Sequence, residues 1–154
     1  MPSDFQHKNR FRAGCLILSG DRVLLESDPG IDLWYVPGGG VEPGETLTEA
    51  ARREMKEELS VDVSVLELRA VVERHFSFDE GARRFHEIGF YFFAKHPLEV
   101  GPDFVADGKV YRWHLIEQIA SLPMVPEALG ASLQKAILND RLEWLGKESP
   151  PHTS

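Results

Sequence analysis

The pattern of apolar and polar positions predicts several short strands in the first part of the chain. Arg12–Ser19 and Arg22–Glu26 are apolar runs on either side of Ser19-Gly20-Asp21, a sequence typical of a hairpin turn. Leu33–Val36 predicts a further short strand. We expect this strand to end at Pro37 and the three glycines that follow, because proline cannot donate a backbone hydrogen bond to a sheet.

The rest of the chain carries two helical patterns among further strands. Because the helices do not alternate regularly with the strands, a mixed-sheet α+β domain is favoured over a doubly wound one. The predicted elements are a helix over Thr46–Leu59, strands over Val61–Phe78 and Arg84–Lys95, a polar loop over Pro97–Gly108, a strand over Val110–Leu115 and a helix over Pro126–Leu138.

The length of the chain fits one small domain. A chain of 154 residues can bury a single substantial core, and no repeat or internal linker divides this one. We therefore expect a single domain over residues 1–154, with flexible tails at about residues 1–9 and 147–154.

Charge and cysteine content restrict the partners and the location. The net charge of −8 argues against a nucleic-acid partner, because a protein that binds nucleic acid needs a basic surface. The longest apolar runs, Cys15–Leu18 and Gly89–Ala94, are far too short to span a membrane, and Met1–Arg12 lacks the pattern of a secretory signal. Cys15 is the only cysteine and cannot form an internal disulfide. These features together predict a cytoplasmic protein without a membrane partner.

The first predicted helix has an apolar stripe and an unusual placement of acidic residues. Its stripe consists of Leu47, Ala51, Met55 and Leu59, and Thr46 with Glu49 forms a capping box at its start. The polar side chains Glu49, Arg52, Arg53 and Lys56 fall opposite the stripe, as expected for a surface helix.

Three glutamates depart from this arrangement. Glu54 and Glu58 project along the apolar stripe, with Glu57 just beside it. A solvated helix face with Lys and Arg pairing is the ordinary explanation for a glutamate-rich helix, but it would place these residues opposite the stripe. Crowded carboxylates on a packed face suit a hard divalent cation, and Mg²⁺ is typically held by one or two carboxylates together with substrate phosphates. Such a cation would also let an acidic protein bind an anionic substrate.

The same segment resembles a known sequence motif. Gly39, five residues, Glu45, seven residues and then Arg53-Glu54-Met55-Lys56-Glu57-Glu58-Leu59-Ser60-Val61 closely resemble the Nudix box, and Trp34-Tyr35-Val36-Pro37-Gly38-Gly39 is also similar to family members. The resemblance implies a Nudix-type α/β/α sandwich with a mixed β-sheet between helices. It also implies Mg²⁺-dependent hydrolysis of a diphosphate linkage, with Mn²⁺ as an alternative cofactor.

The resemblance assigns roles to the residues of the box. It implies that Glu54, Glu57 and Glu58 are metal ligands, helped by a carbonyl near Gly38 or Gly39. Glu45 and Arg53 are implied to orient these ligands. One position departs from the pattern, because Ser60 stands where the box has a glycine that would end the helix in a left-handed conformation. We expect a local change at the helix end and no loss of activity.

The general base and the substrate-binding residues are left open by the sequence. Glu87, Asp103, Asp107 or a glutamate of the box are the candidates for the base. Phe76, Tyr91 and Phe93 are candidates for stacking a nucleobase, although aromatic residues on strands are more often core residues. Arg74, Arg83 and Arg84 are candidates for phosphate contacts or for an ordinary charged surface.

The resemblance implies a small-molecule nucleotide as substrate. A nucleoside triphosphate, including an oxidised one, and a nucleotide sugar such as ADP-ribose are the main choices. The alternatives are a non-catalytic nucleotide-sensing module and an RNA 5′-end pyrophosphohydrolase, and the acidic charge disfavours the latter. The resemblance also makes a homodimer an expectation.

Overall fold

The computed structural model describes residues 6–125, 127, 129–139 and 141–146. Its larger sheet has the strand order β4-β1-β6-β5-β9, and its smaller sheet has the order β2-β3-β8-β7. The elements are β1 (Gln6–Leu16), β2 (Leu18–Ser19), β3 (Arg22–Ser27), β4 (Gly38–Gly40), α1 (Leu47–Leu59), β5 (Ser64–Phe78), η1 (Asp79–Gly81), β6 (Arg83–Lys95), β7 (Phe104–Ala106), β8 (Lys109–Leu115), η2 (Ile116–Ser121), α2 (Leu129–Leu138) and β9 (Glu143–Gly146).

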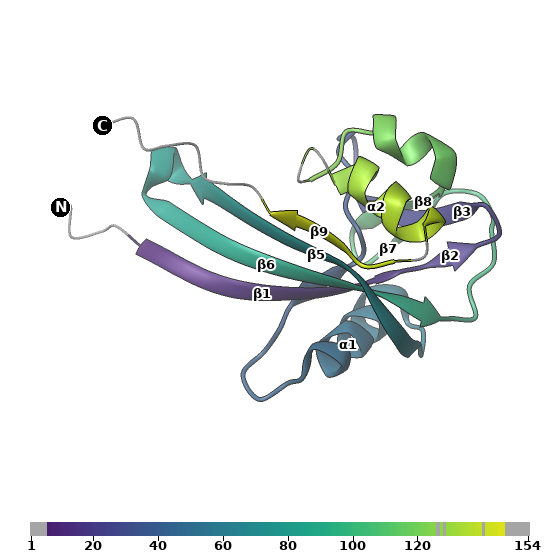
Figure 1. Ribbon diagram of the computed structural model, residues 1–154, viewed down its shortest axis with the longest axis horizontal. Coiled ribbons are helices and arrows are strands. Elements are labelled where there is room, and N and C mark those ends of the chain that lie inside the picture. Colours follow the sequence, from purple (N-terminus) through teal and green to yellow (C-terminus); the bar gives the residue numbers. More distant parts are fainter. Residues whose placement is uncertain (1–5, 126, 128, 140, 147–154) are drawn as a thin grey trace.

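The larger sheet is mixed and lies between the two α-helices. β1 pairs with β6 in parallel and β5 pairs with β9 in parallel, whereas β5–β6 and β1–β4 are antiparallel. Figure 1 shows α1 on one side of this sheet and α2 on the other, with β1, β5 and β6 extending together beyond the helices. The predicted α+β fold, a sandwich with a mixed sheet between helices, is confirmed.

The core consists of two clusters, one on each face of the larger sheet. Leu16 of β1 packs in the cluster that contains Leu129 and Leu133 of α2. Ala13, Cys15 and Ile17 of the same chain segment pack in the other cluster, which contains Met55 of α1. Successive side chains of a strand point to opposite faces, so the continuous apolar runs seen in the sequence serve both clusters.

Several predicted boundaries were wrong because strand pairing extends or interrupts them. Residues 6–9, expected in a tail, begin β1 and pair with the start of β6. The expected strand Leu33–Val36 is reduced to isolated bridges at Trp34 and Tyr35, while the glycines expected to end it form β4 against β1. The predicted loop contains β7, and β9 was not predicted. The tails at 1–5 and 147–154, and positions 126 and 128 of the predicted second helix, lie outside the described residues.

Among the described residues, none of the helices is both long enough and apolar enough to cross a membrane.

Candidate active site

The helix α1 begins and ends as local chemistry dictates. The Thr46 hydroxyl accepts a hydrogen bond from the Glu49 backbone N–H at 3.1 Å, and the Glu49 carboxylate accepts one from the Thr46 N–H at 3.0 Å. The capping box is therefore confirmed. At the other end Ser60 has φ 57° and ψ 33°, and its N–H donates to the Lys56 carbonyl at 3.1 Å. Ser60 thus adopts the left-handed conformation expected of the glycine it replaces.

The predicted placement of the glutamates on α1 is confirmed in its main point. Ala50, Ala51 and Met55 are fully buried, and the side chain of Glu54 beside them is only 14% exposed. Glu58 is half-buried, whereas Glu57 lies at the margin with its side chain 56% exposed. Two carboxylates therefore do lie on the packed side of the helix, with the third at its edge.

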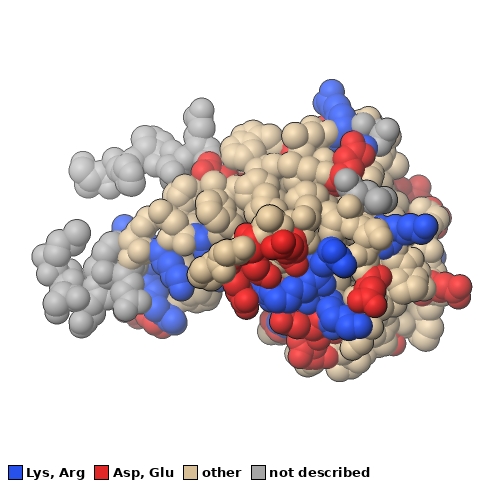
Figure 2. All heavy atoms as spheres, turned by 90° about the horizontal axis from the view of Figure 1, so that it is seen from below, with Lys and Arg blue, Asp and Glu red and all other residues tan. Residues whose placement is uncertain are grey.

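Arg53 connects these carboxylates to the loop before the helix. Its Nε and one terminal nitrogen donate to the two oxygens of Glu45 at 2.7 and 2.9 Å. The other terminal nitrogen donates to Glu54 at 2.9 Å and to Glu57 at 3.2 Å, and a further bond at 2.9 Å reaches the Gly40 carbonyl. Arg53 lowers the pKa of Glu45 to about 2, so this pair stays ionised. Figure 2 shows acidic and basic side chains gathered together on the face that α1 covers.

The glycine loop lets the backbone approach one of these carboxylates closely. A side chain at Gly39 would collide with the carboxyl group of Glu54. The backbone of β4 and the Glu54 carboxylate therefore lie against each other, and a side chain at position 39 would force this carboxylate to move.

Glu58 faces a second buried carboxylate, Glu26, which was not among the residues predicted for the site. Burial and the neighbouring charges of Glu26 and Glu54 raise the pKa of Glu58 to about 9. Glu26, on β3, is buried, accepts a hydrogen bond from the Tyr111 hydroxyl at 3.0 Å and lies 3.7 Å from the Arg12 guanidinium. The sequence held a signal for Glu26, since it is an acidic residue directly after the apolar run Val23-Leu24-Leu25.

These residues fit a divalent cation. One carboxylate oxygen of Glu58, Oε2, is buried without a hydrogen-bond partner among the described residues. An unpartnered buried carboxylate is costly, and a cation is the ligand that would satisfy it. The described residues contain no preassembled group of three or more acidic, His or Cys side chains that could enclose a metal. Mg²⁺ does not require one, because it usually keeps several waters and shares substrate phosphates.

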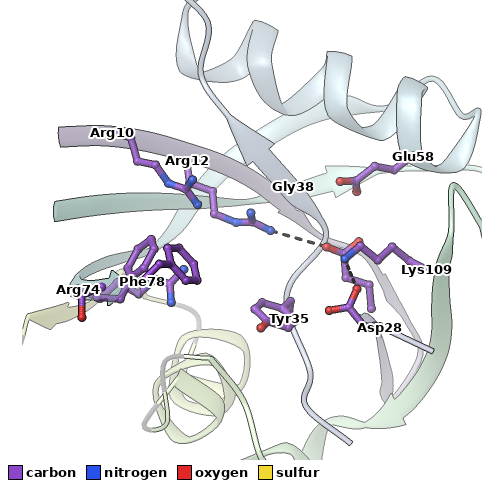
Figure 3. Close-up of a pocket in the computed structure, with 12 residues that line it drawn as sticks. Arg10, Arg12, Asp28, Tyr35, Gly38, Glu58, Arg74, Phe78 and Lys109 are labelled. Atoms are coloured by element: carbon purple, nitrogen blue, oxygen red, sulfur yellow. Dashed lines mark hydrogen bonds and ion pairs between the residues drawn. The ribbon is translucent and has the colours of Figure 1, made fainter. Parts of the chain in front are cut away.

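A cavity of about 460 Å³ opens beside Glu58. Figure 3 shows Glu58, Lys109 and Asp28 at one end of it, and Arg10, Arg74 and Phe78 at the other. The cavity lining is part polar and part apolar, and its charges are of both signs. Its charged and aromatic lining consists of Arg10, Arg12, Arg74 and Lys109, of Glu26, Asp28 and Glu58, and of Tyr35, Phe76 and Phe78.

The candidate bases outside the box do not face this cavity. Glu87 is buried between Arg10 and Arg74, and although burial opposes its ionisation, these arginines lower its pKa. Asp103 is paired with Arg112 at 2.7 Å, which lowers its pKa, and Asp107 is exposed in the turn between β7 and β8. None of the three lines the cavity. The carboxylates that do line it and lack a basic partner at hydrogen-bonding distance are Glu58 and Glu26.

The structure separates the candidate substrate-binding residues. Phe76 and Arg74 line the cavity. Tyr91 is buried in the core, and the Phe93 ring is covered by the Arg69 guanidinium at 4.7 Å. Arg83, which pairs with Asp79 at 2.7 Å, and Arg84 do not line the cavity.

The fold and the glutamate helix define a class of hydrolase, and comparison with known proteins agrees. The profile of the NUDIX domain family matches residues 8–135. The chain therefore belongs to the Nudix hydrolase family, and it is an enzyme that acts on diphosphate linkages. The prediction of an enzyme is confirmed, and the non-catalytic alternative is set aside.

Individual relatives are more distant. The Nudix hydrolase YvcI of Bacillus subtilis (strain 168) is 30% identical over 113 residues, which are 73% of this chain and 70% of that protein. The RNA pyrophosphohydrolase of Legionella pneumophila (strain Corby) is 27% identical over 73% of this chain, but this match spans only 57% of the relative. The crystal structure of a MutT protein from Bacillus halodurans has a TM-score of 0.63 at 26% identity, covering 88% of this chain and 86% of that one.

Proposed function

We propose that this enzyme hydrolyses a diphosphate linkage in a nucleoside diphosphate derivative and that it requires Mg²⁺, for which Mn²⁺ can substitute. The observation that carries the proposal is the unpartnered Glu58 oxygen beside a cavity that also presents four basic side chains. The acidic end suits a cation and the basic side chains suit phosphates, so one cavity offers both partners of a metal–diphosphate complex.

The residues of the Nudix box would have two different roles, metal binding and the orientation of the metal ligands. Glu54, Glu57 and Glu58 would hold the cation, together with a carbonyl of the Gly38–Gly39 segment. When bound, the cation would neutralise charge on the diphosphate and polarise the bond that is cleaved. Arg53 would fix Glu54 and Glu57, and Glu45 would in turn fix Arg53.

The attacking water needs a carboxylate that can accept its proton. We assign this role to the cavity-lining pair Glu58 and Glu26 in preference to Glu87, whose two oxygens are held by arginines. Arg12 lies beside Glu26 and lines the cavity, where its charge would favour the phosphate oxygens.

The substrate choices are a nucleoside triphosphate and a nucleotide sugar such as ADP-ribose. Cleavage of a triphosphorylated RNA end is a second candidate, because the Legionella relatives carry that name. The acidic overall charge favours the small molecule. We also propose a cytoplasmic location, which fits a single buried cysteine.

A panel of substrates tests the proposal. Nucleoside triphosphates, an oxidised triphosphate, ADP-ribose and triphosphorylated RNA would each be incubated with Mg²⁺, and the released products quantified. We expect turnover of at least one small nucleotide and its loss in excess chelator. Full turnover in chelator would contradict the metal requirement.

A further inference from the structure

At the end of the cavity away from Glu58, two lining arginines and a buried glutamate behind them form one row across the larger sheet. Arg10 of β1 lies opposite Glu87 of β6, and Arg74 of β5 lies opposite the same glutamate. The Glu87 side chain is buried, and each of its oxygens accepts a hydrogen bond from the Nε of one arginine, at 2.9 Å for Arg74. One buried anion therefore holds two cations side by side.

The two arginines are held by one edge only. Both use Nε for Glu87, and within the described part of the chain their terminal nitrogens have no hydrogen-bond partner. The side chains are 38% and 20% exposed for Arg10 and Arg74, and both line the cavity. The terminal edge of a guanidinium group is the part that binds phosphate oxygens in pairs.

The aromatic residues here support the arginines more than they offer a surface for a base. The Arg74 guanidinium lies 4.1 Å from the centre of the Phe76 ring, and that of Arg10 lies 5.4 Å from it. The same ring is stacked on Phe85 with a centroid distance of 5.0 Å. Phe78 lies edge-on to the Phe76 ring at 5.6 Å, so Phe76 is already in contact with four groups, and a nucleobase would have to displace one of them.

We propose that the Arg10–Arg74 pair binds a terminal phosphate group of the substrate, beyond the linkage that is cleaved, and that Glu87 is a positioning residue for this pair. The inference rests on the proposed function, because it takes the Glu58 end of the cavity as the site of cleavage. Figure 3 shows the arginines separated from Glu58 across the cavity, as this division requires. A phosphate-binding pair at this end of the cavity favours a phosphate-terminated substrate, such as a nucleoside triphosphate, over a nucleotide sugar.

Binding of inorganic tripolyphosphate in chelator tests the pair without turnover. Calorimetry should show binding by the wild-type protein and a loss of roughly 10-fold or more in affinity for Arg10→Gln and for Arg74→Gln. Arg83→Gln is the matched control, because Arg83 is on the same hairpin but is paired with Asp79 outside the cavity. Wild-type affinity in both cavity variants, or an equal loss in the control, would overturn the proposal.

The variant Glu87→Gln tests whether Glu87 affects phosphate binding by positioning the two arginines or by its own negative charge. Removing the negative charge alone would strengthen phosphate binding, whereas releasing the two arginines should weaken it. We expect weaker binding, with Glu87→Gln adding little to Arg74→Gln in the double variant. Circular dichroism would confirm that each variant is folded, and tighter tripolyphosphate binding by folded Glu87→Gln would overturn the positioning role.

Kinetics with Mg²⁺ then separate this inference from the proposed function. Arg74→Gln should raise KM for a nucleoside triphosphate by roughly 10-fold and change KM for ADP-ribose little. Equal effects on both substrates would overturn the terminal-phosphate assignment. If no substrate is hydrolysed while tripolyphosphate still binds as described, the phosphate site stands and the proposed function fails.

Discussion

Glu54, Glu57 and Glu58 belong to one helix, yet each has a different environment. Glu54 and Glu57 are held by Arg53, while Glu58 has an oxygen without a partner and faces Glu26. Glu49, on the same helix, faces solvent and only closes the capping box. The angle around the helix axis therefore decides which glutamate lies on the packed side of α1 and which faces solvent.

Charge-removing substitutions on α1 should separate these residues. Glu57→Gln and Glu58→Gln should each lower kcat by orders of magnitude through lost metal binding, whereas Glu49→Gln should change it hardly at all. A titration of Mg²⁺ against turnover checks this, because raised Mg²⁺ should partly restore a variant whose defect is metal affinity. Equal, mild effects at all three positions would contradict the assignment of the metal site.

His114 predicts a pH dependence of stability that is separate from catalysis. Burial and the charge of Arg112 lower its pKa to about 4, and its Nε2 is buried without a partner in the described region. In the unfolded chain its pKa is about 6.5, so between these values the unfolded state binds more protons. The free energy of unfolding should therefore fall as the pH drops from about 6.5 to 4, by about 1–3 kcal/mol from this group.

Urea unfolding across that pH range checks the His114 prediction. The variant His114→Gln should show a smaller loss of stability between pH 6.5 and 4 than the wild type. The exposed His7 provides a control, and His7→Gln should keep the wild-type slope. A His114→Gln slope equal to the wild type would rule out the contribution.

At the scale of the element, the end of α1 shows how one departure from the family motif is accommodated. Ser60 takes a left-handed conformation and still caps the helix by donating to Lys56. A serine pays a small steric cost there that glycine does not, while glycine has more freedom to lose on folding. These two effects oppose each other, and the left-handed helix end is kept, so the local change predicted at the helix end is not observed.

Ser60→Gly should accordingly change the free energy of unfolding by at most about 1 kcal/mol and leave kcat within a few-fold. Denaturant unfolding and steady-state kinetics on the same preparation would measure both. A gain in kcat of two orders of magnitude would instead show that serine impairs the native site.

Across the whole molecule, an acidic chain presents a cavity that gathers basic side chains as well as acidic ones. The net charge is −8, yet Arg10, Arg12, Arg74 and Lys109 all line the one cavity that Glu58 of α1 also lines. A bound cation would relieve the repulsion that Glu26 and Glu54 exert on Glu58, which, together with burial, raises the pKa of Glu58. The homodimer implied by the family resemblance stays a prediction.

Metal binding should therefore stabilise the whole fold. Added Mg²⁺ should raise Tm in proportion to the logarithm of its concentration, with about 2.7 kcal/mol gained at 100 times Kd. Matched NaCl should not do so, and Glu58→Gln should lose most of the increment. Chelator should abolish activity and leave the far-ultraviolet circular dichroism spectrum unchanged. Unfolding in chelator would mean that the metal is structural.

The sequence by itself determined those features of the protein that depend on interactions between residues close together in the chain. The Thr46 cap, the apolar stripe of α1 and the inward side of Glu54 and Glu58 follow from residues within one helix, where the 3.6-residue period fixes direction. The long strands β5 and β6 were also predictable, because β-branched and aromatic residues recur along both of them. Their pairing and the length of β1 were not, since these depend on partners distant in the chain.

Only the tertiary structure decided which polar residues share the cavity. Glu26 reaches Glu58 through the packing of β3 near the end of α1, and Arg10, Glu87 and Arg74 meet through the register of three strands. That register joins positions up to 77 residues apart. A shift of one residue would turn these side chains to the opposite face of the sheet, so no local pattern could specify the site.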